Sequence, residues 1–249
     1  MIQAVYTIFR RELGAYFAAP LAWIFLLMFA FLAVVLSFFV GDLFGRGQAD
    51  LKPFFNVLPW LLLFFVPAVS MRLWAEERQT GNIELLLTLP VRTGQLVAGK
   101  FFAAWSFVGL ALVMTVSLWL TVEFLGEPDN ATVGLAYLSA WLLAGAMLAV
   151  GSLLSAVTRS QVLAFVLTVP VLFLLLLPGL METIGANSLV SGRLGMWLEL
   201  WRSLALVRSY RQMTEGLFSI ADVLFFIGTM VIFLAATVSM LEWKKAHAS

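Results

Sequence analysis

The sequence predicts an all-α integral membrane protein that crosses the bilayer six times. Hydrophobic residues make up 62% of the 249 residues and charged residues only 12%, whereas soluble domains contain roughly 45–50% apolar and about 25% charged residues. The mean hydropathy is +1.00. Each crossing needs about 20 apolar residues, so a chain of this length accommodates about six helices with short connections. We therefore expect one transmembrane domain over residues 1–249.

Residues 1–17 are expected to form an amphipathic interfacial helix that lies on the membrane surface. Ile2, Val5 and Phe9 recur at helical spacing, and polar residues such as Glu12 occupy the other face. A signal peptide is the alternative interpretation. The apolar run that follows is too long for the hydrophobic region of a signal peptide and lacks a convincing cleavage site, so we interpret it as a retained first span.

Six apolar runs are the expected transmembrane helices. Pro20 suits the first turn of the first run, where its missing N–H leaves no hydrogen bond unmade. The fourth run contains small residues, among them Gly134, Gly145 and Gly151, at which neighbouring helices can approach closely. The expected spans are residues 20–41, 53–71, 98–125, 132–157, 162–181 and 222–243.

Internal prolines occur only in the second and fifth runs, as two prolines eight residues apart in each. Each proline removes a helical hydrogen bond and kinks its helix. A kinked helix exposes backbone carbonyls that can line a cavity, although kinks are also tolerated with no function. The pathway-lining candidates are Pro59, Pro67, Pro170 and Pro178.

The distribution of positive charge predicts the orientation. With the N-terminus inside, nine of the fifteen Lys and Arg residues fall on the inner side, and cytoplasmic loops carry the excess of such residues. Both termini are therefore expected in the cytoplasm. Residues 182–221 would lie outside it, where Trp197, Trp201 and Leu204 recur at helical spacing and favour an interfacial or re-entrant helix over a free loop.

Residues 72–96 concentrate charge between two spans, and we expect them to form a cytoplasmic helical hairpin. A short first helix over residues 72–79 ends at Gly81, and a second leucine-rich helix ends at Pro90. A solvated loop is the alternative, but a loop has no need of several leucines. Among the N-terminal residues, Glu12 is the charged residue that we expect to belong with these charges.

Several function classes are excluded. Residues 94–101, GQLVAGKF, nearly match the phosphate-loop pattern. However, Phe101 replaces the hydroxyl that would hold Mg²⁺, and no buried strand precedes the segment. Lys100 is therefore interpreted as an anchor at the membrane surface. With no cysteine, one histidine and a net charge of +1, we expect no catalytic residue, no metal site and no nucleic-acid partner.

Three segments resemble a known family. Residues 71–101, MRLWAEERQTGNIELLLTLPVRTGQLVAGKF, resemble the hallmark segment between the second and third spans of ABC-2 (type-2 ABC exporter) membrane subunits. This segment combines a glutamate pair with arginine, a glycine, ELLLTLP and a GK that enters the next helix. Residues 10–25, RRELGAYFAAPLAWIF, and 209–226, SYRQMTEGLFSIADVLFF, resemble the gliding-motility and nitrous-oxide-reductase-associated branch.

The resemblance implies a permease subunit in the bacterial cytoplasmic (inner) membrane, with no enzyme activity and no cofactor of its own. ATP and Mg²⁺ would bind a separate ABC ATPase subunit, and the hairpin would be a coupling helix that inserts into it. A second permease copy would complete the pathway, spans two and five would face that pathway, and an accessory membrane or periplasmic protein could join. The implied ATPase-coupling residues are Arg72, Glu76, Glu77, Arg78, Gly81, Glu84, Leu85, Leu86 and Pro90.

Two other function classes stay open. A secondary transporter would need a coupling-ion site near the membrane centre and often internal repeats, and the sequence offers neither. A non-transporting membrane anchor or assembly factor that docks an ATPase is compatible with the same motifs, because they indicate docking more directly than they indicate a substrate path. The sequence does not identify a substrate.

Overall fold

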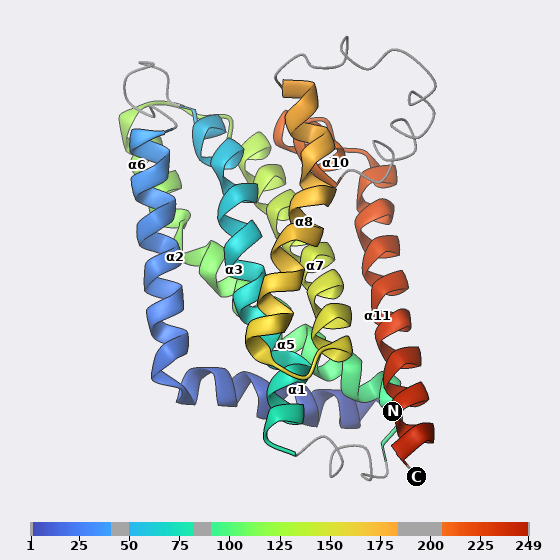
Figure 1. Cartoon of the computed structure of the whole chain (residues 1–249). Coiled ribbons are helices and arrows are strands. Elements are labelled where there is room, and N and C mark those ends of the chain that lie inside the picture. The colour runs from blue at the N-terminus through green and yellow to red at the C-terminus, as the bar shows by residue number, and fades with distance from the viewer. Residues whose placement is uncertain (1, 41–49, 82–90, 184–205, 249) are drawn as a thin grey trace, which may run out of the picture.

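The computed structural model describes residues 2–40, 50–81, 91–183 and 206–248, and the elements it defines there are helices (Figure 1). Six helical segments are long and apolar enough to cross a membrane, which confirms the predicted fold class. The helices are α1 (Ile2–Ala18), α2 (Pro20–Phe39), α3 (Lys52–Gln79), α5 (Thr93–Met114), α6 (Val116–Leu125), α7 (Asn130–Val157), α8 (Gln161–Thr183), α10 (Leu206–Thr214) and α11 (Ile220–Ala248).

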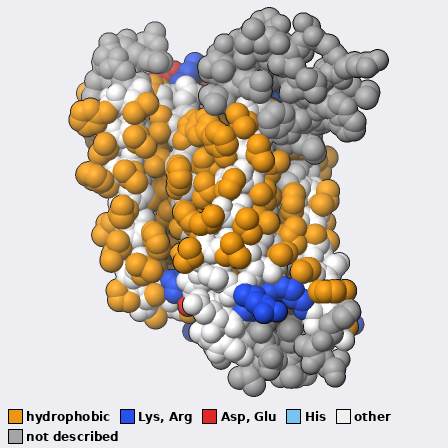
Figure 2. Space-filling view, in the orientation of Figure 1, with side chains coloured by type: hydrophobic (Ala, Val, Ile, Leu, Met, Phe, Trp, Pro, Cys, Tyr) orange, Lys and Arg blue, Asp and Glu red, His pale blue; other side chains and the backbone are white. Residues whose placement is uncertain are grey.

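Helix α7 forms the centre of the bundle. In its most apolar stretch 78% of the residues are buried, against 28% for α2 and α8 and 17% for α11. It contacts α3, α5, α8, α10 and α11. The outer faces of the peripheral helices present apolar side chains along the middle of the bundle (Figure 2), as expected for surfaces that face lipid.

Helix α1 lies across one end of the bundle, where both chain termini also lie (Figure 1). It packs along α5, and Tyr16 stacks on Phe107 of that helix with ring centroids 4.9 Å apart. The chain then turns at Ala19, whose backbone is extended, and Pro20 opens α2 in its first turn as predicted. The interfacial helix is thus attached to the bundle at its end.

Pro59 in α3 frees a backbone carbonyl that another helix satisfies. Pro59 has no N–H for the carbonyl of Phe55 one turn earlier. The hydroxyl of Tyr210 donates to that carbonyl at 2.7 Å. Burial raises the pKa of the Tyr210 hydroxyl well above its usual value, so it stays protonated and can donate. This contact ties α10 into the bundle at the end opposite α1.

The third span is not one continuous helix as predicted. It consists of α5 and α6, which meet at Thr115. The Thr115 carbonyl accepts a hydrogen bond from the Tyr137 hydroxyl of α7 at 3.0 Å. The same carbonyl accepts the Leu118 N–H at 3.0 Å, so the side chain of a neighbouring helix adds a second bond to the backbone at the break, a tertiary contact that local hydropathy does not contain.

Close helix approach is confirmed at two of the small residues of α7. A Cβ atom on Gly145 would lie 2.7 Å from the indole nitrogen of Trp105, and one on Gly151 would lie 2.6 Å from the Cβ of Ser70. A Cβ on Gly134 would meet nothing within 4 Å. Gly151 therefore sets the distance between α7 and α3.

Replacing Gly151 with alanine is predicted to destabilise the bundle by about 1–3 kcal/mol, because the added methyl group would push α3 away from α7. Gly134→Ala is the matched control in the same helix, and it should be neutral or slightly stabilising because alanine favours the helix. The thermal unfolding midpoint in detergent, followed by circular dichroism, measures both. Equal midpoints for the two variants would contradict this account of the α3–α7 contact.

Candidate functional site

The last two turns of α3, residues 72–79, are called here the α3 extension. The sequence predicts a short separate helix for these residues. That prediction is wrong, because α3 runs without interruption from Lys52 to Gln79. The helix stops before Gly81, whose φ of 74° lies in the left-handed region that glycine favours. The charged extension is thus a continuous helical extension of the second span.

Lys100, in α5, is the most buried charged side chain at this end of the described structure, with 2% of its surface exposed. Its Nζ lies 2.8 Å from Glu77 of the α3 extension and 3.1 Å from Glu12 of α1. The same ammonium lies 5.7 Å from the centroid of the Trp74 ring, a distance at which a cation is attracted to the ring face. Our interpretation of Lys100 as a surface anchor is therefore wrong.

We call Glu12, Lys100 and Glu77 the ion triad. A buried cation is costly unless charges and hydrogen bonds compensate it, and here carboxylates from two other helices do so. Burial alone raises the pKa of the Glu12 carboxyl, but Lys100 and Arg11 outweigh that effect and hold the pKa below its usual value. Glu12 is therefore ionised at neutral pH, and the triad joins α1, α3 and α5 at one point.

Serine side chains of α7 hold the other side of the α3 extension. The hydroxyl of Ser155 accepts from the backbone N–H groups of Trp74 and Ala75 at 3.2 and 3.1 Å, and donates to the Met71 carbonyl at 3.2 Å. The Trp74 indole donates to Ser152 at 3.1 Å. Ser155 thus lies across the Met71–Ala75 pair of α3, which fixes the extension to the central helix.

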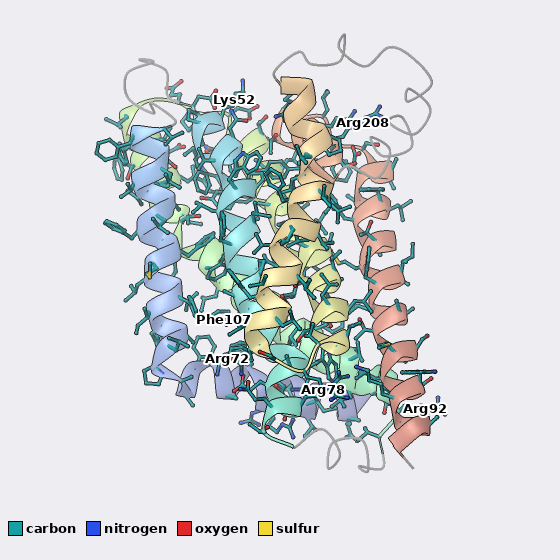
Figure 3. All side chains as sticks on the ribbon, viewed as in Figure 1. Lys52, Arg72, Arg78, Arg92, Phe107 and Arg208 are labelled. Atoms are coloured by element: carbon teal, nitrogen blue, oxygen red, sulfur yellow. The ribbon has the colours of Figure 1, made fainter. Side chains whose placement is uncertain are left out.

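The three other charged residues of the extension also bond within the chain. Arg78 donates to the carbonyls of Val157 and Thr158 at the end of α7, at 3.3 and 3.1 Å. Arg72 pairs with Glu76 one turn later, with 2.8 Å between Nε and Oε2. Both arginines lie at the end of the bundle that carries α1, whereas Lys52 and Arg208 lie at the opposite end (Figure 3).

The sequence matches the family described as ABC-2 family transporter protein over residues 6–245. The chain belongs to the ABC-2 transporter family. Proteins of this family are the membrane components of ABC transporters; they lack a nucleotide-binding domain of their own, which implies an ABC ATPase partner. A comparison with curated proteins gives no match.

The structure places the predicted coupling residues of this ABC-2 protein in three groups. Glu77 and Arg78 face other helices of the chain, and the Arg72–Glu76 pair is partly exposed, with side-chain exposures of 25% and 37%. Gly81 is exposed at the end of the extension. The remaining predicted residues lie outside the described residues; they are Glu84, Leu85, Leu86 and Pro90.

The four prolines do not lie on one surface of this ABC-2 protein. Pro59 lines a cavity of about 510 Å³ between α3, α8 and α10, together with Asn56, Trp60 and Tyr210. Pro67 and Pro178 are buried, and Pro170 is exposed. Of these four, Pro59 is therefore the proline that borders an open space at the end of the bundle opposite α1. In the described ranges, no three His, Cys, Asp or Glu side chains come together as they would to hold a metal ion.

Sequence reasoning missed the contacts that fix the extension. Ser152, Ser155 and Trp74 carry no pattern that distinguishes them from ordinary residues of apolar helices. Lys100 offered a signal, since it is a charge at the start of a long apolar run and is predicted on the same side of the membrane as Glu12 and Glu77. The contact itself can be predicted only when the relative positions of α1, α3 and α5 are known.

Replacing Lys100 with methionine is predicted to lower the free energy of unfolding by about 3 kcal/mol, because two carboxylates then stay close together without their cation. Arg10→Met, which removes an exposed charge from α1, should change it by less than about 0.5 kcal/mol. The measurement is the unfolding midpoint of the detergent-solubilised protein.

A triple variant, Lys100→Met with Glu12→Gln and Glu77→Gln, tests whether the unpaired carboxylates cause this loss of stability. It removes all three charges, so it should recover much of the stability lost in Lys100→Met, since neutral replacement of a buried ion pair is often tolerated. A triple variant less stable than the single variant would argue against the ion triad.

Proposed function

We propose that this chain is the permease subunit of an ABC exporter, and that its α3 extension passes force from a separate ATPase subunit to the membrane helices. The observation that carries the proposal is the fixation of the extension. It is bonded to α1 and α5 through Lys100 and to α7 through Ser155. A displacement applied beyond Gln79 would therefore move several spans together.

The surface that would meet the ATPase begins after Arg78, the last residue of the extension that is bonded to another helix. Glu77 and Arg78 are already bonded within the chain, so their proposed role in coupling is to hold the extension rather than to touch the partner. Gln79, Thr80 and Gly81 are exposed. Residues 82–90, which follow directly and are rich in leucine, are the proposed docking segment, with Glu84, Leu85, Leu86 and Pro90 as its contacts.

The proposed orientation puts α1, both termini and the docking segment in the cytoplasm of a bacterial cell. Arg72, Arg78 and Arg92 lie toward this end (Figure 3), and Arg10 and Arg11 belong to α1, in line with the excess of positive charge on cytoplasmic sides. Helix α10 would then face the extracytoplasmic side. ATP hydrolysis on the partner would drive export toward that side, where the cavity beside Pro59 opens between α3 and α10.

A second permease copy is proposed to complete the pathway, because family members work in pairs according to the resemblance found in the sequence. The likeness of residues 10–25 and 209–226 to gliding-motility and nitrous-oxide-reductase-associated permeases supports membership of that branch and an accessory protein. Both proposals depend on the family assignment and go beyond it.

The alternative functions make different predictions for the purified protein. An ATPase that stays bound through detergent extraction favours the ABC assembly over a secondary transporter. ATPase activity that rises with an added substrate favours a transporter over a membrane anchor. A complex that hydrolyses ATP at the same rate with and without substrates, and moves none of them in vesicles, would support the anchor.

Photo-crosslinking tests the docking segment, because the chain contains no cysteine and each introduced cysteine is unique. Thr80→Cys, labelled with benzophenone maleimide in membranes that also contain the ATPase encoded nearest to this gene, should crosslink to that ATPase on illumination. Glu127→Cys, exposed between α6 and α7 at the opposite end, is the matched control and should not.

Gel electrophoresis with antibodies to both proteins reads out the crosslink. If the ATPase co-purifies with the permease while the Thr80→Cys variant forms no adduct, or if the Glu127→Cys variant forms one, the proposed docking surface is wrong.

A further inference from the structure

Three basic side chains gather where α3, α7 and α11 end, and we call them the basic cluster: Arg78, Arg159 and Lys244. Arg78 belongs to the α3 extension, Arg159 to the turn between α7 and α8, and Lys244 to the last turns of α11. Basic side chains lie directly below the apolar surface of α8 and α11 (Figure 2), and Arg78 lies at this level (Figure 3).

Hydrogen bonds to the end of α7 bring the cluster together. Arg78 and Lys244 both donate to the carbonyl of Val157, at 3.3 and 3.0 Å, and Lys244 also donates to that of Ala156 at 3.0 Å. The positive charge of Arg159 lies near both of them and repels both. A helix C-terminus attracts cations, so these bonds alone could be ordinary capping of α7.

Capping does not account for all of the charge. A helix C-terminus contributes about half a negative charge, whereas the cluster brings three positive ones. Within the described residues, the ion pairs involve other cations and none of these three. The Nη2 atom of Arg78 is buried and has no hydrogen-bond acceptor. Buried polar atoms normally have a partner, so the positive charge of the cluster is not fully compensated within the described residues.

The surroundings of the cluster indicate which anion fits. Helix α8 exposes Val162 and Val166 immediately after the Arg159 turn, and α11 exposes Val231 and Ile232 before Lys244. Trp243, 58% exposed, is of the type that anchors helices between headgroups and tails. A phospholipid whose acyl chains cover these apolar faces would bring its phosphate to the level of the cluster.

We propose that Arg78, Arg159 and Lys244 bind the phosphate of an anionic phospholipid in the leaflet at the α1 end of the bundle. A guanidinium can donate two parallel hydrogen bonds to phosphate oxygens, and the exposed side chain of Arg159 is available to do so. Anionic headgroups attract basic residues beside a span end. This site does not depend on the proposed docking of the ATPase.

Native mass spectrometry of the full chain in detergent tests the proposal. Dioleoylphosphatidylglycerol should bind at least about tenfold more tightly than dioleoylphosphatidylcholine, because three cations favour a net negative headgroup. The double variant Arg159→Gln with Lys244→Gln should lose roughly tenfold in affinity for the anionic lipid, with no change for the neutral one. Both substituted residues lie outside the proposed ATPase-coupling set.

The matched control removes the same number of charges at the same end of the bundle. Arg10→Gln with Lys245→Gln, both exposed, should leave the affinity for phosphatidylglycerol unchanged. An equal loss in this control would show general attraction to basic residues and overturn the site. So would equal binding of the two lipids by the unmodified protein.

Two further measurements distinguish the remaining outcomes. Glycerol 3-phosphate replaces the lipid in a parallel titration; if it binds as tightly as phosphatidylglycerol, the ligand is a free phosphate ester and the lipid assignment falls. If the double variant weakens ATPase co-purification but not lipid binding, the cluster holds an acidic partner segment instead. If the double variant unfolds, Arg159→Gln alone takes its place in the test. This change removes an exposed side chain with no hydrogen bond in the described structure, and it should still weaken binding of the anionic lipid.

Discussion

The arrangement of this protein depends on one buried cation. Lys100 lies between Glu12 and Glu77 with 2% of its surface exposed, and its charge can be accommodated there only while both carboxylates stay in place. These residues belong to α1, α3 and α5, so the interfacial helix, the extension of the second span and the start of the third span share one electrostatic contact. The same contact, together with the packing of α1 along α5, holds α1 across the end of the bundle.

Besides the ion triad, hydroxyl groups also join the helices by bonding to backbone groups. Helices that carry prolines or breaks leave backbone groups without partners, which an apolar environment penalises. Tyr210 satisfies the carbonyl of Phe55 that Pro59 leaves free, Tyr137 donates to the Thr115 carbonyl between α5 and α6, and Ser155 lies across a turn of α3. Two of these three hydroxyls come from the central helix α7, which therefore bonds to both the α5–α6 junction and the α3 extension. The extension thus has the support that a force-transmitting element needs.

The sequence was sufficient for features that depend on local hydropathy, and insufficient for those that depend on contacts between distant residues. The six spans, the amphipathic first helix, the start of α2 at Pro20 and the stop before Gly81 could be predicted because apolar run length, helical periodicity and turn residues are local. The continuity of α3 through residues 72–79 and the break at Thr115 could not, because partners on α5 and α7 decide them. Lys100 was misinterpreted for the same reason: the two carboxylates that offset the cost of its burial lie 88 and 23 residues away in the chain.

The central claim is that the ion triad makes α1 and the α3 extension one rigid body. Spin labels on Arg10→Cys and Gln79→Cys, both at exposed positions, report the distance between these helices by double electron–electron resonance. We predict a single narrow distance distribution for the protein with Lys100, and a clearly broader one after Lys100→Met, since the shared cation is then gone. An equally narrow distribution in the Lys100→Met variant, in protein that remains folded, would contradict the account.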